Sequence, residues 1–93
     1  MSLAPKSVLI PPITISLDGA KVTIVEVLDM SITDFDRMYL VSCYVEYRGY
    51  RSKVFHLLVR SNSELLAKLR AEIAKMKLFL WMKQTHLFEK AAK

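Results

Sequence analysis

The 93-residue chain is 53% hydrophobic and 25% charged, a composition typical of one folded domain and not of a disordered segment. Its single cysteine, Cys43, excludes an internal disulfide and any zinc site that needs several cysteines. We find no signal peptide and no apolar run near the roughly 18 residues that a membrane span needs, so we expect a cytoplasmic protein with no membrane partner.

The net charge of +5 is concentrated in the second part of the chain. Residues 1–36 contain two lysines and five acidic residues, whereas residues 37–93 contain twelve Lys and Arg against four acidic residues. Such asymmetry draws polyanions towards one part of a surface. Asn62 and Gln84 are the only side-chain amides, and depletion of amides is typical of proteins from thermophiles.

The consecutive strands predicted along the sequence indicate an antiparallel β-meander. Pro11 and Pro12 hold residues 1–12 as an extended leader. The Asp18-Gly19 pair favours a tight type I′ hairpin between the first two strands. Four antiparallel strands are expected, at residues 13–16, 21–28, 37–48 and 50–60.

A helical period replaces the strand period after Ser61, which with Glu64 forms the Ser-x-x-Glu pattern of a capping box. Neither Gly nor Pro follows, so we expect a long C-terminal α-helix and an α+β fold. Apolar residues recur at alternating spacings of three and four, a heptad seam that only Lys83 interrupts. These residues are Leu66, Leu69, Ile73, Met76, Leu80 and Leu87.

Length decides what this seam is expected to contact. Most amphipathic helices pack on their own sheet, but about 30 helical residues span roughly 45 Å, against about 33 Å for a ten-residue strand. Residues 78–82, which include Trp81, are apolar on every side. We therefore expect residues 13–77 to form the domain and residues 78–93 a helical extension that pairs copies, through the seam and Trp81, into a homodimer or higher oligomer. A helix break near Thr85 is the competing interpretation.

The third and fourth strands form a hairpin in which aromatic and cationic residues interleave around Gly49. Cations that bind phosphate and rings that stack on bases are the parts of a single-strand nucleic-acid platform. Strand alternation across an even-numbered turn places Tyr39, Tyr47, Tyr50 and His56 on one face, and the helix is expected to cover the other. The candidate nucleic-acid-binding residues are Arg37, Tyr39, Tyr47, Arg48, Tyr50, Arg51, Lys53, His56 and Arg60.

A second interpretation belongs to another class of function. Tyrosine and valine are ordinary strand formers, so the aromatic face also suits a protein-interaction module whose face is buried between subunits. Catalysis is not expected. Asp34 and Asp36 fit solvated turn positions, and His56 and His86 have no metal-ligand spacing. We predict a non-enzyme that needs no metal or cofactor.

The order of elements resembles that of the ThermoDBP-related proteins, small single-strand DNA-binding proteins of thermophilic archaea. The resemblance is carried by residues 47–55, Tyr-Arg-Gly-Tyr-Arg-Ser-Lys-Val-Phe, and by the leucine-periodic helix from Ser63 onward. It implies sequence-independent binding of single-stranded DNA, in preference to RNA, in a cleft with basic edges and an apolar floor. It also implies an oligomer.

Overall fold

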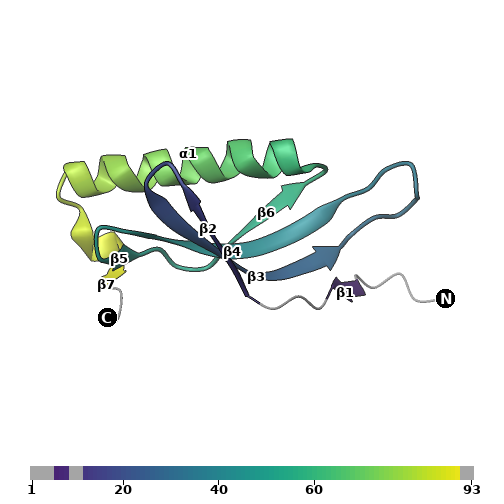
Figure 1. Ribbon diagram of the computed structural model, residues 1–93, viewed down its shortest axis with the longest axis horizontal. Coiled ribbons are helices and arrows are strands. Elements are labelled where there is room, and N and C mark those ends of the chain that lie inside the picture. Colours follow the sequence, from purple (N-terminus) through teal and green to yellow (C-terminus); the bar gives the residue numbers. More distant parts are fainter. Residues whose placement is uncertain (1–5, 9–11, 91–93) are drawn as a thin grey trace.

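One α-helix lies along one face of a twisted antiparallel β-sheet (Figure 1). The computed structural model describes residues 6–8 and 12–90. The molecule is elongated, with extents of 49 × 23 × 20 Å. Among the described residues no helix is long and apolar enough to cross a membrane.

The two longest strands, β3 and β4, pair at the centre of the sheet. Both β1 and β2 pair with β3, both β5 and β6 pair with β4, and β7 pairs with β5. The strands are β1 (Lys6–Val8), β2 (Ile13–Leu17), β3 (Ala20–Asp29), β4 (Tyr39–Tyr47), β5 (Tyr50–Arg51), β6 (Phe55–Val59) and β7 (Glu89–Lys90). The antiparallel sheet followed by a helix is as expected, but the strand count is not. One strand falls in the expected leader, the expected fourth strand is divided, and the C-terminal segment adds another.

Both tight turns have two residues with positive φ, the conformation of a type I′ hairpin. Asp18 and Gly19 have φ of 52° and 81°, and Leu17 pairs directly with Ala20, which confirms the predicted turn. Arg48 and Gly49 have φ of 51° and 80° between the paired Tyr47 and Tyr50. The two-residue turn fixes both tyrosines on one face of the sheet.

A bulge between β5 and β6 changes the pairing register. Glu46 pairs with Arg51, but three positions further Cys43 pairs with Phe55, so one extra residue has been inserted. Ser52 holds the bulge, because its hydroxyl accepts the Val45 N–H at 2.9 Å where a ladder carbonyl would otherwise do so. From the bulge onward, every side chain lies on the opposite face from that predicted by simple alternation.

The helix α1 (Asn62–Trp81) covers the face that was expected to be open. Leu69, Ile73 and Met76 are buried against sheet residues that include Val22 and Val45. Three residues of the heptad seam therefore pack on the chain's own sheet, and their predicted role in oligomerisation is wrong. Leu80 is half-buried and packs on the same core, whereas Leu66, Trp81 and Leu87 are exposed.

The start of α1 agrees with the capping box. Ser61 has extended backbone angles and its hydroxyl accepts the Glu64 N–H at 3.2 Å. The Glu64 carboxylate in turn accepts the backbone N–H of Arg60 at 2.8 Å. The first bond satisfies an N–H group that the first turn of a helix leaves without a partner, and the second ties the residue before the cap to that turn.

The end of α1 differs from the expectation, because the helix stops at Trp81. Lys83 adopts φ of 62°, and the N–H groups of Lys83 and Gln84 bond back to the carbonyls of Leu80 and Phe79. These bonds form a Schellman motif in which lysine occupies the position usually taken by glycine. The chain then turns through a 3₁₀ helix η1 (Thr85–Leu87) and returns to the sheet as β7. The structure therefore agrees with the competing interpretation, a helix break near Thr85, for the described part of residues 78–93, while residues 91–93 lie outside it.

Candidate nucleic-acid interface

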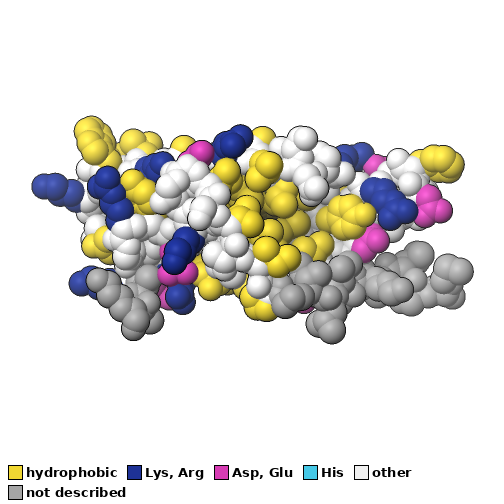
Figure 2. Space-filling model, viewed as in Figure 1, with side chains coloured by type: hydrophobic (Ala, Val, Ile, Leu, Met, Phe, Trp, Pro, Cys, Tyr) yellow, Lys and Arg dark blue, Asp and Glu magenta, His cyan; other side chains and the backbone are white. Residues whose placement is uncertain are grey.

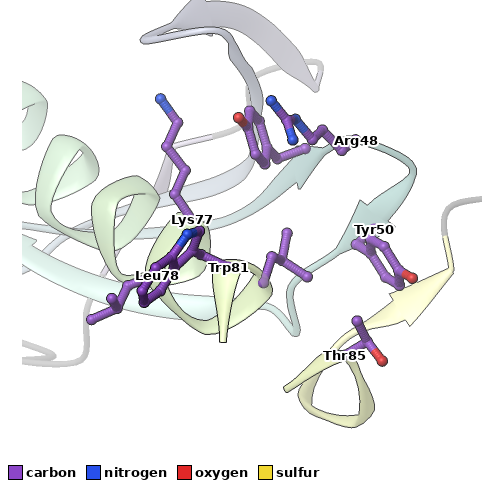
Figure 3. Close-up of a pocket in the computed structure, with 8 residues that line it drawn as sticks. Arg48, Tyr50, Lys77, Leu78, Trp81 and Thr85 are labelled. Atoms are coloured by element: carbon purple, nitrogen blue, oxygen red, sulfur yellow. The ribbon is translucent and has the colours of Figure 1, made fainter. Parts of the chain in front are cut away.

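A groove of about 580 Å³ lies between the β4–β5 hairpin tip and the last turn of α1 (Figure 3). We call it the hairpin–helix groove. Two tyrosines, one tryptophan, two cations and two leucines form most of its wall. The lining residues are Tyr47, Arg48, Tyr50, Lys77, Leu78, Leu80, Trp81 and Thr85.

Local structure places the aromatic walls. Tyr47 and Tyr50 are the paired residues that flank the two-residue turn, so both rings point to the helix side of the sheet. Lys77 and Trp81 are four residues apart on α1 and therefore share one helix face. Trp81 keeps 81% of its surface exposed, while Tyr47 and Tyr50 are half-buried. The hairpin side of the groove is therefore held in place by packing, whereas the side formed by Trp81 is exposed to solvent.

Two cations lie over the ring of Tyr47. The Arg48 guanidinium carbon is 5.3 Å from the ring centroid, and Lys77 Nζ is 5.2 Å from it. Lys77 Nζ also donates a hydrogen bond to the Asp18 carbonyl at 2.6 Å. Within residues 6–8 and 12–90, no ion pair involves Arg48 or Lys77, so no carboxylate of that region neutralises them. Their charge is available to an anion in the groove.

The backbone of Arg48 is strained. A residue with a Cβ pays about 1–2 kcal/mol for the left-handed region, where this turn position normally has Asn, Asp or Gly. Strain of this kind clusters at functional sites, so an observed outlier is a reason to look for a function. Asparagine would suit the turn backbone better, so what distinguishes arginine here is its positive charge and its contact with the Tyr47 ring.

A second hollow of about 250 Å³ continues the groove across the hairpin tips. It shares Tyr47 and Arg48 with the hairpin–helix groove and adds Lys21 from β3 and Glu46 from β4. The two hollows together lead from the end of α1, over the β4–β5 turn, to the β2–β3 turn. Figure 2 shows basic side chains gathered towards this end of the molecule.

Three predicted residues lie away from the groove, and two of them, Arg51 and His56, are on the face that the helix leaves open. Arg51 lies 4.9 Å from the Tyr44 ring centroid and 3.6 Å from a Glu46 carboxylate oxygen. His56 is paired with Ser42, whose hydroxyl lies 2.7 Å from His56 Nδ1. Lys53 is exposed within the bulge. The prediction that His56 shares a face with Tyr47 and Tyr50 is therefore wrong, because the extra residue at Ser52–Val54 inverts the face of β6.

Three further predicted residues lie at the opposite end of the sheet. Tyr39 pairs with Val59 and is half-buried on the helix side, so it does share a face with Tyr47 and Tyr50. Arg60 forms an ion pair with Asp36. A hydrogen bond to Tyr39, followed by the charge of Asp34, raises the pKa of Arg37. The structure therefore brings together only Tyr47, Arg48 and Tyr50 from the predicted set.

Sequence reasoning missed Lys77, and it assigned Trp81 to oligomerisation alone. The signal was the spacing of four that places both on one helix face. What the sequence did not show was the helix end after Trp81, which brings this face beside the hairpin tip.

The remaining reactive groups offer no comparable site. Burial, followed by the charge of Glu72, raises the pKa of the Cys43 thiol to about 12, so the folded protein holds it as an inert thiol. Over the described residues, no group of three or more His, Cys, Asp or Glu side chains is arranged to hold a metal ion. Asp34 and Asp36 lie on an exposed loop.

No family model matches the chain, and no curated protein and no solved structure shows significant similarity to it.

Proposed function

We propose that the protein binds single-stranded nucleic acid without catalysis and largely without sequence preference, in the hairpin–helix groove. The observation that carries the proposal is the pair of cations, Arg48 and Lys77, over an aromatic wall that ends in the exposed Trp81. Bases have π faces whatever their identity, so stacking on such walls tolerates any sequence. Phosphates would contact Arg48, Lys77 and Lys21, which lie along the groove and its continuation.

The shape of the hairpin–helix groove favours binding of single strands over binding of duplexes. A stacked base in a duplex presents only its edge, whereas Tyr50 and Trp81 offer ring faces that need an unstacked base. We expect DNA to bind more tightly than RNA, in keeping with the resemblance of the hairpin and helix to single-strand DNA-binding proteins. A cytoplasmic location belongs to the same proposal.

Fluorescence anisotropy of labelled oligo-dT tests the proposal, with single-stranded RNA and a duplex of equal length as comparisons. We expect binding whose log–log salt dependence has a slope of about −0.7 per phosphate neutralised. Since Trp81 is the only tryptophan, its fluorescence should be quenched by the stacked base. No change in anisotropy at low salt would refute the proposal.

Matched variants locate the site. Trp81→Ala should weaken binding by the value of one stacking contact, about 1–3 kcal/mol or roughly five- to 150-fold. Tyr44→Ala removes a tyrosine from the opposite face and should leave the affinity unchanged. Equal losses in the two variants would exclude the groove as the binding site.

Assembly is the second candidate function. It is favoured by exposed apolar residues at both ends of the molecule, including Trp81 and Leu78 beside the groove and Phe35 at the far end. If Trp81→Ala changes the sedimentation behaviour and no nucleic acid binds, assembly becomes the preferred function.

A further inference from the structure

The loop between β3 and β4 ends in two apolar side chains with almost no protein contact. Phe35 is 100% exposed and Ile32 is 90% exposed. Large apolar residues in such positions are typical of sites that are covered by a partner. We call residues 32–36 the loop tip.

Hydrogen bonds hold the loop tip in a defined shape. The Met30 N–H donates to the Met38 carbonyl at 2.8 Å, and the Met38 N–H donates to the Ser31 hydroxyl at 2.9 Å. The Asp36 N–H donates to the Thr33 hydroxyl at 3.1 Å. A preformed loop loses little conformational entropy when a partner covers it.

The sequence Asp34-Phe35-Asp36 places the exposed ring between two carboxylates. Asp36 pairs with Arg60, while Asp34 lies near enough to raise the pKa of Arg37. Asp36 is therefore neutralised by Arg60, whereas Asp34 forms no ion pair within the described residues, so its carboxylate supplies the acidic charge beside the ring. An apolar cavity with a basic rim would be complementary to this tip.

The hairpin–helix groove has that chemistry at the other end of the molecule. Its walls include Tyr50, Leu80 and Trp81, and its cations are Arg48 and Lys77. The loop tip extends beyond the N-terminal end of α1, whereas the groove lies at the C-terminal end (Figure 1). A single chain therefore cannot close the contact on itself, but successive copies can.

We propose that copies of this chain associate head to tail, with Phe35 of one copy inserted between Tyr50 and Trp81 of the next. The carboxylate of Asp34, which forms no ion pair within the described residues, faces Arg48 and Lys77 of that second copy. The contact joins two different surfaces, so it is heterologous and leaves a free tip and a free groove at the ends of every assembly. It produces open chains that lengthen with concentration, and not a closed dimer.

The same contact regulates the groove, and this part rests on the proposed function. A loop tip in the groove excludes a nucleic-acid strand, so association and strand binding compete. The contact is small, since it buries one aromatic and one aliphatic side chain, and small interfaces are weak. Free strand should therefore dissolve the assemblies, and the assemblies should weaken apparent strand binding only at high protein concentration.

Sedimentation velocity over micromolar to millimolar protein tests the association. Wild-type protein should show a sedimentation coefficient that rises continuously with concentration. Phe35→Ser and Trp81→Ala should each weaken association by about tenfold or more, as expected for an aromatic anchor and its pocket. Leu58→Ser, which changes an exposed apolar residue on the open sheet face, should behave like wild type. Circular dichroism checks that each variant is folded.

Mixing the two variants provides the decisive measurement. Phe35→Ser retains the groove and Trp81→Ala retains the loop tip, so an equimolar mixture should form a one-to-one heterodimer and nothing larger. A wild-type protein that stays monomeric at all concentrations would overturn the proposal. So would a mixture that stays monomeric, because the two surfaces then do not pair.

Nucleic acid separates this inference from the proposed function. With dilute protein, Phe35→Ser should bind oligo-dT as tightly as wild type, and oligo-dT should dissociate concentrated wild type. If oligo-dT does not bind but the heterodimer forms, the proposed function fails and head-to-tail association stands. If Phe35→Ser weakens strand binding in dilute solution, Phe35 contacts the strand and competition at the groove is overturned.

Discussion

Replacing Arg48 with asparagine should stabilise the fold and weaken nucleic-acid binding at the same time. Arg48 has φ of 51° at the first position of the type I′ turn, where asparagine is strongly favoured. The same residue supplies one of the two cations over Tyr47. The two effects are therefore opposite in sign and come from different atoms.

The magnitudes follow from these two features. Left-handed backbone costs an ordinary residue about 1–2 kcal/mol, most of which asparagine avoids, while loss of the exposed cation–π contact to Tyr47 costs about 0.5–1 kcal/mol. We therefore expect a net gain of about 0.5–1 kcal/mol in the free energy of unfolding. For a domain of this size that gain raises Tm by roughly 2–8 °C. Loss of one phosphate contact should reduce the log–log salt slope of oligo-dT binding by about 0.7.

Thermal unfolding followed by circular dichroism measures the first effect, and anisotropy at several salt concentrations measures the second. Lys53→Gln is the matched control, because it removes the same charge from the bulge outside the groove and should leave the slope unchanged. A slope that falls for Lys53→Gln and not for Arg48→Asn would refute the groove as the binding site. A lower Tm for Arg48→Asn than for Arg48→Ala would refute the argument from backbone strain, because both variants lose the contact with Tyr47 and only asparagine favours the left-handed conformation.

Three other measurements test the fold. Lys83→Gly should raise the free energy of unfolding by about 1 kcal/mol, because glycine adopts the left-handed position of the Schellman motif without strain; a thermal melt that shows a loss would contradict the cap. Ile73→Ala should lower the free energy of unfolding in urea by about 2–5 kcal/mol without changing the molecular mass in solution at micromolar concentration. A change in molecular mass without a loss of stability would instead indicate that Ile73 lies in a subunit interface. The Cys43 thiol ionises near pH 9 when unfolded and near pH 12 when folded, so its stabilising contribution is complete below pH 9 and is lost as the pH rises to 12. Cys43→Ala should therefore flatten the decline in unfolding free energy over that interval, and an unchanged decline would refute the burial effect.

The local signals in the sequence predicted local structure well. The Asp18-Gly19 turn and the Ser61 cap occur where expected, because each depends on the backbone preferences of adjacent residues. The antiparallel sheet and the single α-helix also follow from hydrophobic periodicity.

The face of β6 could not be predicted, because a bulge at Ser52 changes the pairing register. Simple alternation assigns Phe55 and Tyr39 to different faces, whereas Ser52 inserts an extra residue and brings both to the helix side. The end of the helix at Lys83 could not be predicted either, because lysine favours a continuing helix. Contacts that form when the chain returns to the sheet as β7 offset the cost of its left-handed conformation.

The heptad seam shows how one pattern fits two partners. Leu69 and Ile73 satisfy a coiled coil and an amphipathic helix on a sheet equally well. A helix of about 30 residues would be too long for the sheet, but α1 has only 20 residues and fits it. The same ambiguity affects the candidate site, since the sequence indicates a subunit contact for Trp81 but does not show that Trp81 lines one groove with Arg48 and Tyr50.

The Ser52 bulge also bears on solubility. An uninterrupted outer strand would present a long row of free N–H and C=O groups, which is a template for aggregation. The bulge divides that row into the two residues of β5, which β7 covers, and the five residues of β6. Lys68 Nζ donates to the Leu58 carbonyl of β6 at 2.7 Å, which occupies one backbone acceptor of that strand with a charged side chain. We therefore expect the irregularity that inverts the face of β6 also to reduce aggregation through strand edges.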